Sequence, residues 1–153
     1  MPIPTIPRIA VTTSGLGLKA LKTSGGAYEF TLTHNGAVAA TVKSGRNGGP
    51  TQIEWASGAR AAAARYALEG IIAAYPTFHY RGMDVRVTPE IVLGEVLNIA
   101  EMRKTLRTKT IFQVNGTEYQ IKAAYDATVA AQIRGMYPDA VILNEDPAYA
   151  VAA

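Results

Sequence analysis

A glycine-rich loop that contains a single arginine is the first candidate for chemistry in this sequence. It runs through Arg46, Asn47, Gly48 and Gly49 to Pro50. Glycines allow successive backbone N–H groups to turn inward as a nest for an anion, and a planar guanidinium can clamp a phosphate. The loop lacks the Gly-Lys-Ser/Thr ending of a P-loop, and a strand is expected after it. The pattern therefore indicates either an anion-binding loop or a long hairpin loop whose glycines supply positive φ.

Two further groups of cations are candidate contacts to phosphate or to an acidic protein. The first is Arg60 and Arg65, near the start of an alanine-rich helix. The second is Arg103, Lys104 and Arg107, at the end of another expected helix. Arg103 and Arg107 share a helix face because they are four residues apart. Such groups neutralise phosphates, but cations at a helix C-terminus also stabilise the helix dipole without any partner.

An aromatic connection supplies the last candidates, Tyr80 and Arg81, because tyrosine and arginine are favoured as anchors in protein interfaces. The two histidines, His34 and His79, lie far apart and lack the spacing of a metal site. The sequence has no cysteine and no Gly-x-Ser-x-Gly motif. We therefore expect a non-enzymatic protein with no catalytic residue, no metal and no cofactor.

The composition is that of a folded domain. The chain has 153 residues, of which 48% are hydrophobic and 18% charged, with a formal net charge of +3. These values exclude a disordered chain, and the absence of cysteine excludes a disulfide scaffold. Residues 1–76 hold seven basic and three acidic residues, so the positive charge belongs to the first half. No segment is long and apolar enough to span a membrane, and no signal peptide is evident, so we expect a cytoplasmic location.

Alternating apolar and polar residues predict a three-stranded antiparallel meander in the first half of the chain. Strands are expected at 28–33, 38–42 and 52–55, with a weaker edge strand at 16–22. The Asn-Gly pair at 35–36 is typical of a two-residue hairpin turn, because both central residues of that turn need positive φ.

Helices and a second hairpin complete the expected α+β fold. It is predicted as a single compact domain over 16–145, with an extended proline-rich arm at 1–15 and a short tail at 146–153. The remaining expected elements are a helix capped by Ser57 and ending near Tyr75, a short strand at 85–87, a helix from the Thr88 cap to about Arg107, a hairpin of 110–114 and 118–122, a helix over 126–137 and a final strand at 140–143.

The meander and the helix that follows it resemble the latter part of a double-stranded-RNA-binding domain, over residues 28–72. That resemblance implies phosphate contacts from cations at the helix start. Arg60 and Arg65 are the matching residues, although the family uses lysines there. The helix that precedes the sheet in that family is replaced here by proline-rich sequence. Arg65 also has the spacing to pair with Glu69 on the same helix face.

A second resemblance covers the whole chain and concerns small uncharacterised proteins of bacteriophages and other mobile elements. It implies no activity, but it favours an accessory role: an inhibitor of host defence, a helper in DNA transactions or a virion part. The residues that carry it are Tyr28-x-Phe30, Asn35-Gly36, Val38, Val42, Gly45-Arg46-x-Gly48-Gly49-Pro50, Trp55, Lys109-Thr110-x-Phe112, Tyr137-Pro138-Asp139 and Ile142-Leu143-Asn144-Glu145.

Three function classes follow from these observations. The first is a phage or mobile-element accessory protein that binds and blocks a host protein or nucleoprotein complex in the bacterial cytoplasm. The second is a nucleic-acid- or nucleotide-binding protein that uses the glycine-rich loop and the basic groups. The third is a virion structural subunit, which would form a homo-oligomer.

Overall fold

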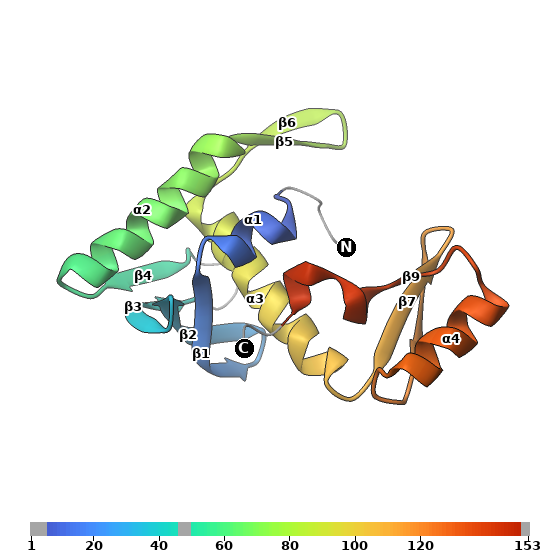
Figure 1. The fold of residues 1–153 in the computed structure, drawn as a ribbon. Coiled ribbons are helices and arrows are strands. Elements are labelled where there is room, and N and C mark those ends of the chain that lie inside the picture. Colours follow the sequence, from blue (N-terminus) through green and yellow to red (C-terminus); the bar gives the residue numbers. More distant parts are fainter. Residues whose placement is uncertain (1–5, 46–49, 151–153) are drawn as a thin grey trace. The chain divides into compact units, whose positions relative to one another are not determined.

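The computed structural model describes residues 6–45 and 50–150 of the chain (Figure 1). The predicted α+β class is confirmed, since helices and antiparallel sheets make up the fold. The residue contacts divide the chain into two compact units, unit 1 (Met1–Leu97) and unit 2 (Asn98–Ala153). The sequence, by contrast, predicts one domain over 16–145. The boundary falls inside helix α3 (Pro89–Leu106), so the two ends of this helix belong to different units.

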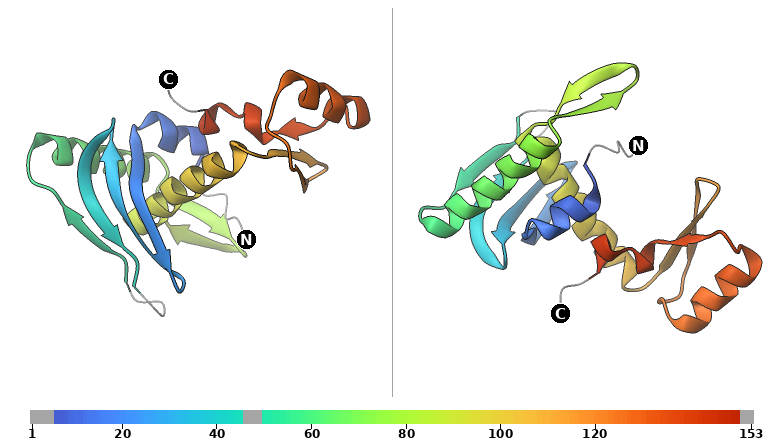
Figure 2. Two further views of the ribbon diagram at one scale, coloured as in Figure 1. Left: turned by 90° about the horizontal axis from the view of Figure 1, so that it is seen from below. Right: turned by 45° about the horizontal axis from the view of Figure 1, so that its top comes forward.

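Unit 1 is built on a four-stranded antiparallel sheet in the order β1-β2-β3-β4 (Figure 2). The sheet therefore includes the predicted edge strand as a full member, which adds a strand to the expected three-stranded meander. Its elements are β1 (Leu16–Ser24), β2 (Ala27–His34), β3 (Ala37–Lys43) and β4 (Gln52–Trp55).

Helix α2 (Ala59–Ala74) covers one face of this sheet and contacts β1, β2 and β3. The buried side chains of Phe30, Leu32 and Val42 lie on one face because their strand register alternates. The helix buries small alanines, Ala61 and Ala64, which allow its backbone to approach the sheet closely. The core of unit 1 therefore combines large side chains from the sheet with small ones from the helix.

Helix α1 (Arg8–Thr13) corrects the prediction of an extended arm over 1–15. Pro7 stands at the N-cap, where its fixed φ and missing N–H are tolerated, so the proline does not oppose a helix that begins after it. The helix ends at Ser14, before Gly15 takes a φ of 84°. The described part of the expected arm is therefore mostly helical.

The predicted cap of α2 at Ser57 is also wrong. Gly58 occupies the N-cap with a φ of 103°, and no side chain caps the helix. A φ of that sign favours glycine over any residue with a Cβ, which explains why the cap falls one residue later.

A hairpin of β5 (Thr77–Tyr80) and β6 (Met83–Arg86) stands where the sequence predicts a connection and one short strand. Its two-residue turn, Arg81-Gly82, has positive φ at both positions, as do the turns at Asn35-Gly36 and Asn115-Gly116. Arginine is a rare residue at positive φ, so this turn gives a much weaker sequence signal than Asn-Gly. The hairpin projects beyond the end of α2 (Figure 1).

Unit 2 contains a three-stranded antiparallel sheet with helix α4 (Ala127–Met136) on one face. The second predicted hairpin, the third main helix and the last strand are confirmed. The carboxylate of Asp126 caps α4 by accepting from the Val129 N–H at 2.8 Å. The strands, in sheet order, are β8 (Thr117–Ile121), β7 (Thr110–Val114) and β9 (Val141–Ile142), and the core residues are Phe112, Ala130, Ile133, Ala140 and Ile142.

The expected short tail is packed into unit 2 as far as it is described. Two 3-10 helices, η2 (Leu143–Glu145) and η3 (Pro147–Tyr149), follow β9, and Tyr149 is buried. Arg103 at the end of α3 donates to the carbonyl oxygens of Ala148 and Ala150 at 3.3 and 3.2 Å. These contacts hold residues 148–150 against the end of α3.

Candidate functional site

The predicted glycine-rich loop lies outside the described residues at its four central positions, Arg46, Asn47, Gly48 and Gly49. Its role in binding an anion therefore stays a prediction.

Both arginines predicted on α2 are exposed, and Arg65 also contacts neighbouring side chains. The Arg65 guanidinium lies over the Trp55 ring at 5.7 Å, and its Nε is 3.5 Å from Glu69 Oε1. The ion pair anticipated from the spacing is thus confirmed. Arg60 is exposed and lines an open pocket of about 580 Å³.

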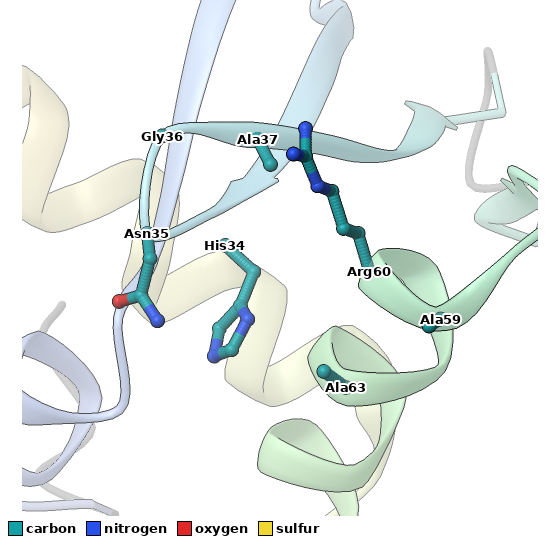
Figure 3. A pocket seen from close by; sticks show the side chains of 7 residues that line it. All are labelled: His34, Asn35, Gly36, Ala37, Ala59, Arg60 and Ala63. Carbon is teal, nitrogen blue, oxygen red and sulfur yellow. The ribbon is translucent and has the colours of Figure 1, made fainter.

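This pocket lies entirely within unit 1, between the β2–β3 turn and the first turns of α2 (Figure 3). Arg60 extends from α2 towards Ala37, and the His34 ring lies between the turn and Ala63. A carboxylate is absent from the described lining. The lining residues are His34, Asn35, Gly36, Ala37, Ala59, Arg60 and Ala63.

The polar wall of the pocket is held by the segment that joins α1 to β1. The His34 Nε2–H donates to the Ser14 carbonyl oxygen at 3.1 Å, and the Asn35 N–H donates to the Gly15 carbonyl oxygen at 2.9 Å. Because a carbonyl oxygen only accepts, Nε2 carries the proton in this contact. The second ring nitrogen, Nδ1, is then the one left for a ligand, and it is turned towards α2 (Figure 3).

Gly15 is required for this arrangement on two counts. Its φ of 84° disfavours a residue with a Cβ, and a Cβ built there would lie 2.1 Å from Asn35 Oδ1. The close approach of the Gly15 backbone to the Asn35 side chain therefore sets the position of the polar wall.

The predicted anchors Tyr80 and Arg81 lie at the tip of the β5–β6 hairpin. The Arg81 guanidinium stacks over the Tyr80 ring at 5.2 Å. The register pairs Phe78 with Val85 and Tyr80 with Met83, so these four side chains share one apolar face. Met83 is 64% exposed. Apart from each other, the two strands contact no other described element extensively.

The cations at the end of α3 do not act as one group. Arg103 is half-buried and bonded to the carbonyl oxygens of the C-terminal segment, so its role inside unit 2 is structural. Lys104 and Arg107 are exposed.

Unit 2 carries an aromatic cluster that is partly exposed. Tyr119 and Tyr137 are 44% and 39% exposed, and their rings are nearly parallel with centroids 6.3 Å apart. Both rings also contact buried Phe112, with centroids 5.5 and 5.9 Å away. The pairing of Tyr119 with Phe112 across the second hairpin was available from its register, but the contact with Tyr137 depends on the fold.

A second polar network ties α4 to the C-terminal segment. The Glu145 carboxylate accepts from Tyr125 Oη at 2.6 Å and from two nitrogens of Arg134, one of them at 3.0 Å. Hydrogen bonds from Arg134 and Tyr125 hold the pKa of Glu145 below its ordinary value, and the bond to Glu145 raises the pKa of Tyr125. The groups are mutually satisfied, which indicates a structural role.

Metal-binding and membrane-spanning features are not found in the part of the chain that the structure describes. No three His, Asp or Glu side chains gather there as a metal site. None of the helices over those residues combines the length and the hydropathy that a membrane span requires. Comparison with family models, with curated proteins and with solved structures finds no match for this chain.

Proposed function

We propose that this protein acts by binding rather than by catalysis, as an accessory protein of a phage or mobile element. It docks on a host protein or nucleoprotein complex and blocks it, with the β5–β6 hairpin as the docking arm. The observation that carries this proposal is the apolar face of the hairpin, formed by Phe78, Tyr80, Met83 and Val85, on which Met83 is 64% exposed and the other three are half-buried.

An exposed apolar side chain at the tip of the hairpin is a ready contact for a partner. A two-stranded hairpin alone is marginally stable in water. Covering Met83, which is 64% exposed, contributes up to roughly 1.5–3 kcal/mol, and covering the half-buried Tyr80 contributes less. Arg81 is already stacked on Tyr80, so docking loses less side-chain entropy at the tip. Tyrosine and arginine are also the residues that most often dominate the energy of protein interfaces.

Site-directed photo-crosslinking in bacterial cells tests this function. A photoreactive amino acid replaces Met83 on the arm, and the control places it at Tyr66 on α2, which is 79% exposed in the same unit. We expect a discrete adduct with another protein from position 83 and none from position 66. Adding Arg81→Glu to the crosslinking chain should abolish the adduct.

Two results would contradict docking through the arm. One is an equal yield of adducts from both positions, and the other is an adduct that Arg81→Glu leaves unchanged. If the only adduct has the mass of two copies of this chain, the arm is a self-association surface, and the virion-subunit alternative takes its place.

Direct nucleic-acid binding is the second candidate, and the distribution of charge favours it for unit 1. That unit holds nine basic and six acidic residues, a net of +3, whereas unit 2 holds six of each and is neutral. Fluorescence anisotropy with a labelled duplex tests it. Affinity should fall steeply as salt rises, because phosphate contacts release counterions. Absent or salt-insensitive binding would remove this candidate.

A further inference from the structure

We propose that the pocket between the β2–β3 turn and α2 binds the phosphate group of a small molecule. The site goes beyond the docking function, because it shares no residue with the β5–β6 arm. It also differs from the predicted anion site in the glycine-rich loop, because it is built from His34, Asn35 and Arg60.

Arg60 supplies the charge of the site. Its guanidinium is exposed at the pocket, and among the described residues it lies against neither an aromatic ring nor a carboxylate, unlike that of Arg65. A planar guanidinium presents two parallel N–H donors, which match two oxygens of a phosphate. A cation in a lining without a carboxylate disfavours cationic ligands and favours anionic ones.

The opposite wall supplies polar groups that are already oriented. The bond from His34 Nε2–H to Ser14 fixes the imidazole ring and leaves the unprotonated Nδ1 on the side of α2, where it can accept from the P–OH of a singly protonated phosphate. The backbone bond from Asn35 to Gly15 fixes the turn that carries the Asn35 amide. Neither wall residue has to rearrange before an anion enters, and such preorganisation lowers the cost of binding.

The size and the remaining lining point to a molecule larger than the phosphate itself. About 580 Å³ lies within the range of roughly 300–1,000 Å³ that is common for small-molecule sites. Gly36, Ala37, Ala59 and Ala63 make the rest of the wall small and largely apolar. The phosphate would lie between Arg60 and His34, with the body of the ligand against the alanines.

The two histidines of the chain provide the assay, because His34 lines the pocket and His79 lies on β5. Proton–carbon NMR spectra of the histidine rings are recorded while inorganic phosphate, adenosine 5′-monophosphate or adenosine is added to the full chain. We expect phosphate and the monophosphate to shift the His34 signal saturably, the monophosphate at lower concentration. Adenosine should shift neither signal, and His79 should not respond.

Matched arginine variants distinguish binding in the pocket from a general effect of positive charge on α2. Arg60→Gln should weaken monophosphate binding at least tenfold, whereas Arg65→Gln, which removes the same charge from the same helix, should change it less than twofold. Unchanged amide signals of the fully buried Leu32 and Val42 show that the core of unit 1 is folded in each variant. The proposal is overturned if neither phosphate nor the monophosphate moves His34, if adenosine binds as well as the monophosphate, or if Arg60→Gln binds as well as the wild type.

Discussion

The Asn144 side chain links the end of α3, the start of β7 and the segment after β9 within unit 2. Replacing it with alanine tests how much these hydrogen bonds stabilise the unit. Its amide Nδ2 donates to the carbonyl oxygens of Leu106 and Lys109 at 3.2 and 2.9 Å. Its Oδ1 accepts from the Ile111 N–H at 3.0 Å. One side chain therefore satisfies the last carbonyl of α3, a carbonyl in the turn that follows it, and an N–H near the start of β7.

The magnitude follows from how far each freed group lies from water. Ile111 is 2% exposed, so its N–H would stay dry and cost about 1–3 kcal/mol. Leu106 and Lys109 are half-buried, so each carbonyl would regain water in part and cost roughly 0.5 kcal/mol. We expect Asn144→Ala to lower the free energy of unfolding of unit 2 by about 2–4 kcal/mol.

Hydrogen exchange measured on peptides of the intact protein is the appropriate assay, because it reports on unit 2 alone. Amides of β7 should exchange roughly 30- to 700-fold faster in the variant, since each 1.4 kcal/mol corresponds to a factor of ten. Asn98→Ala, at an exposed position of α3, is the control and should leave β7 unchanged. If Asn144→Ala accelerates β7 less than about threefold, a difference near 0.6 kcal/mol, or no more than the control does, the reasoning fails.

Three further changes have defined outcomes. Thr110→Val removes a buried hydroxyl that donates to a carbonyl at 2.8 Å and should cost about 1–3 kcal/mol in urea unfolding. Glu145→Gln should cost roughly 0.5–1 kcal/mol at pH 7. The pKa of Glu145 is lower in the folded protein than its ordinary value of 4.5. The stability difference between wild type and variant is therefore present above pH 4.5 and is lost as the pH falls through the lowered pKa. A stability difference that persists at low pH would contradict this reasoning. Ala20→Gly, at a φ of 55°, should raise the midpoint of thermal unfolding, since it relieves a left-handed strain of about 1–2 kcal/mol.

The sequence predicted those elements that depend on the conformational preferences of neighbouring residues. The turns at Asn35-Gly36 and Asn115-Gly116 could be predicted because asparagine and glycine both accept positive φ. The cap at Thr88 followed for the same kind of reason, because its side chain accepts from the N–H three residues later, that of Ile91. The turn at Arg81-Gly82 uses the same backbone geometry with a residue that seldom adopts it, so propensity could not identify the hairpin.

Contacts between distant residues account for what the sequence did not predict in the candidate sites. His34 becomes a wall of the pocket only because the Ser14 carbonyl, twenty residues earlier, orients its ring. Arg103 leaves the predicted binding group because carbonyls at positions 148 and 150 engage it. Sequence spacing shows that two cations share a helix face, but not which of them the fold will use internally.

The internal hydrogen bonds of Arg103 affect how protein docking can be distinguished from nucleic-acid binding. Each phosphate contact adds about 0.9 to the slope of log affinity against log salt. With Arg103 used internally, the predicted group at the end of α3 retains only Lys104 and Arg107, which limits its contribution to a slope of about 1.8. A steeper slope requires contacts from further cations, and unit 1 is the unit that carries the net positive charge. Docking through the apolar face of the β5–β6 arm, by contrast, should depend weakly on salt, so the slope itself separates the two functions.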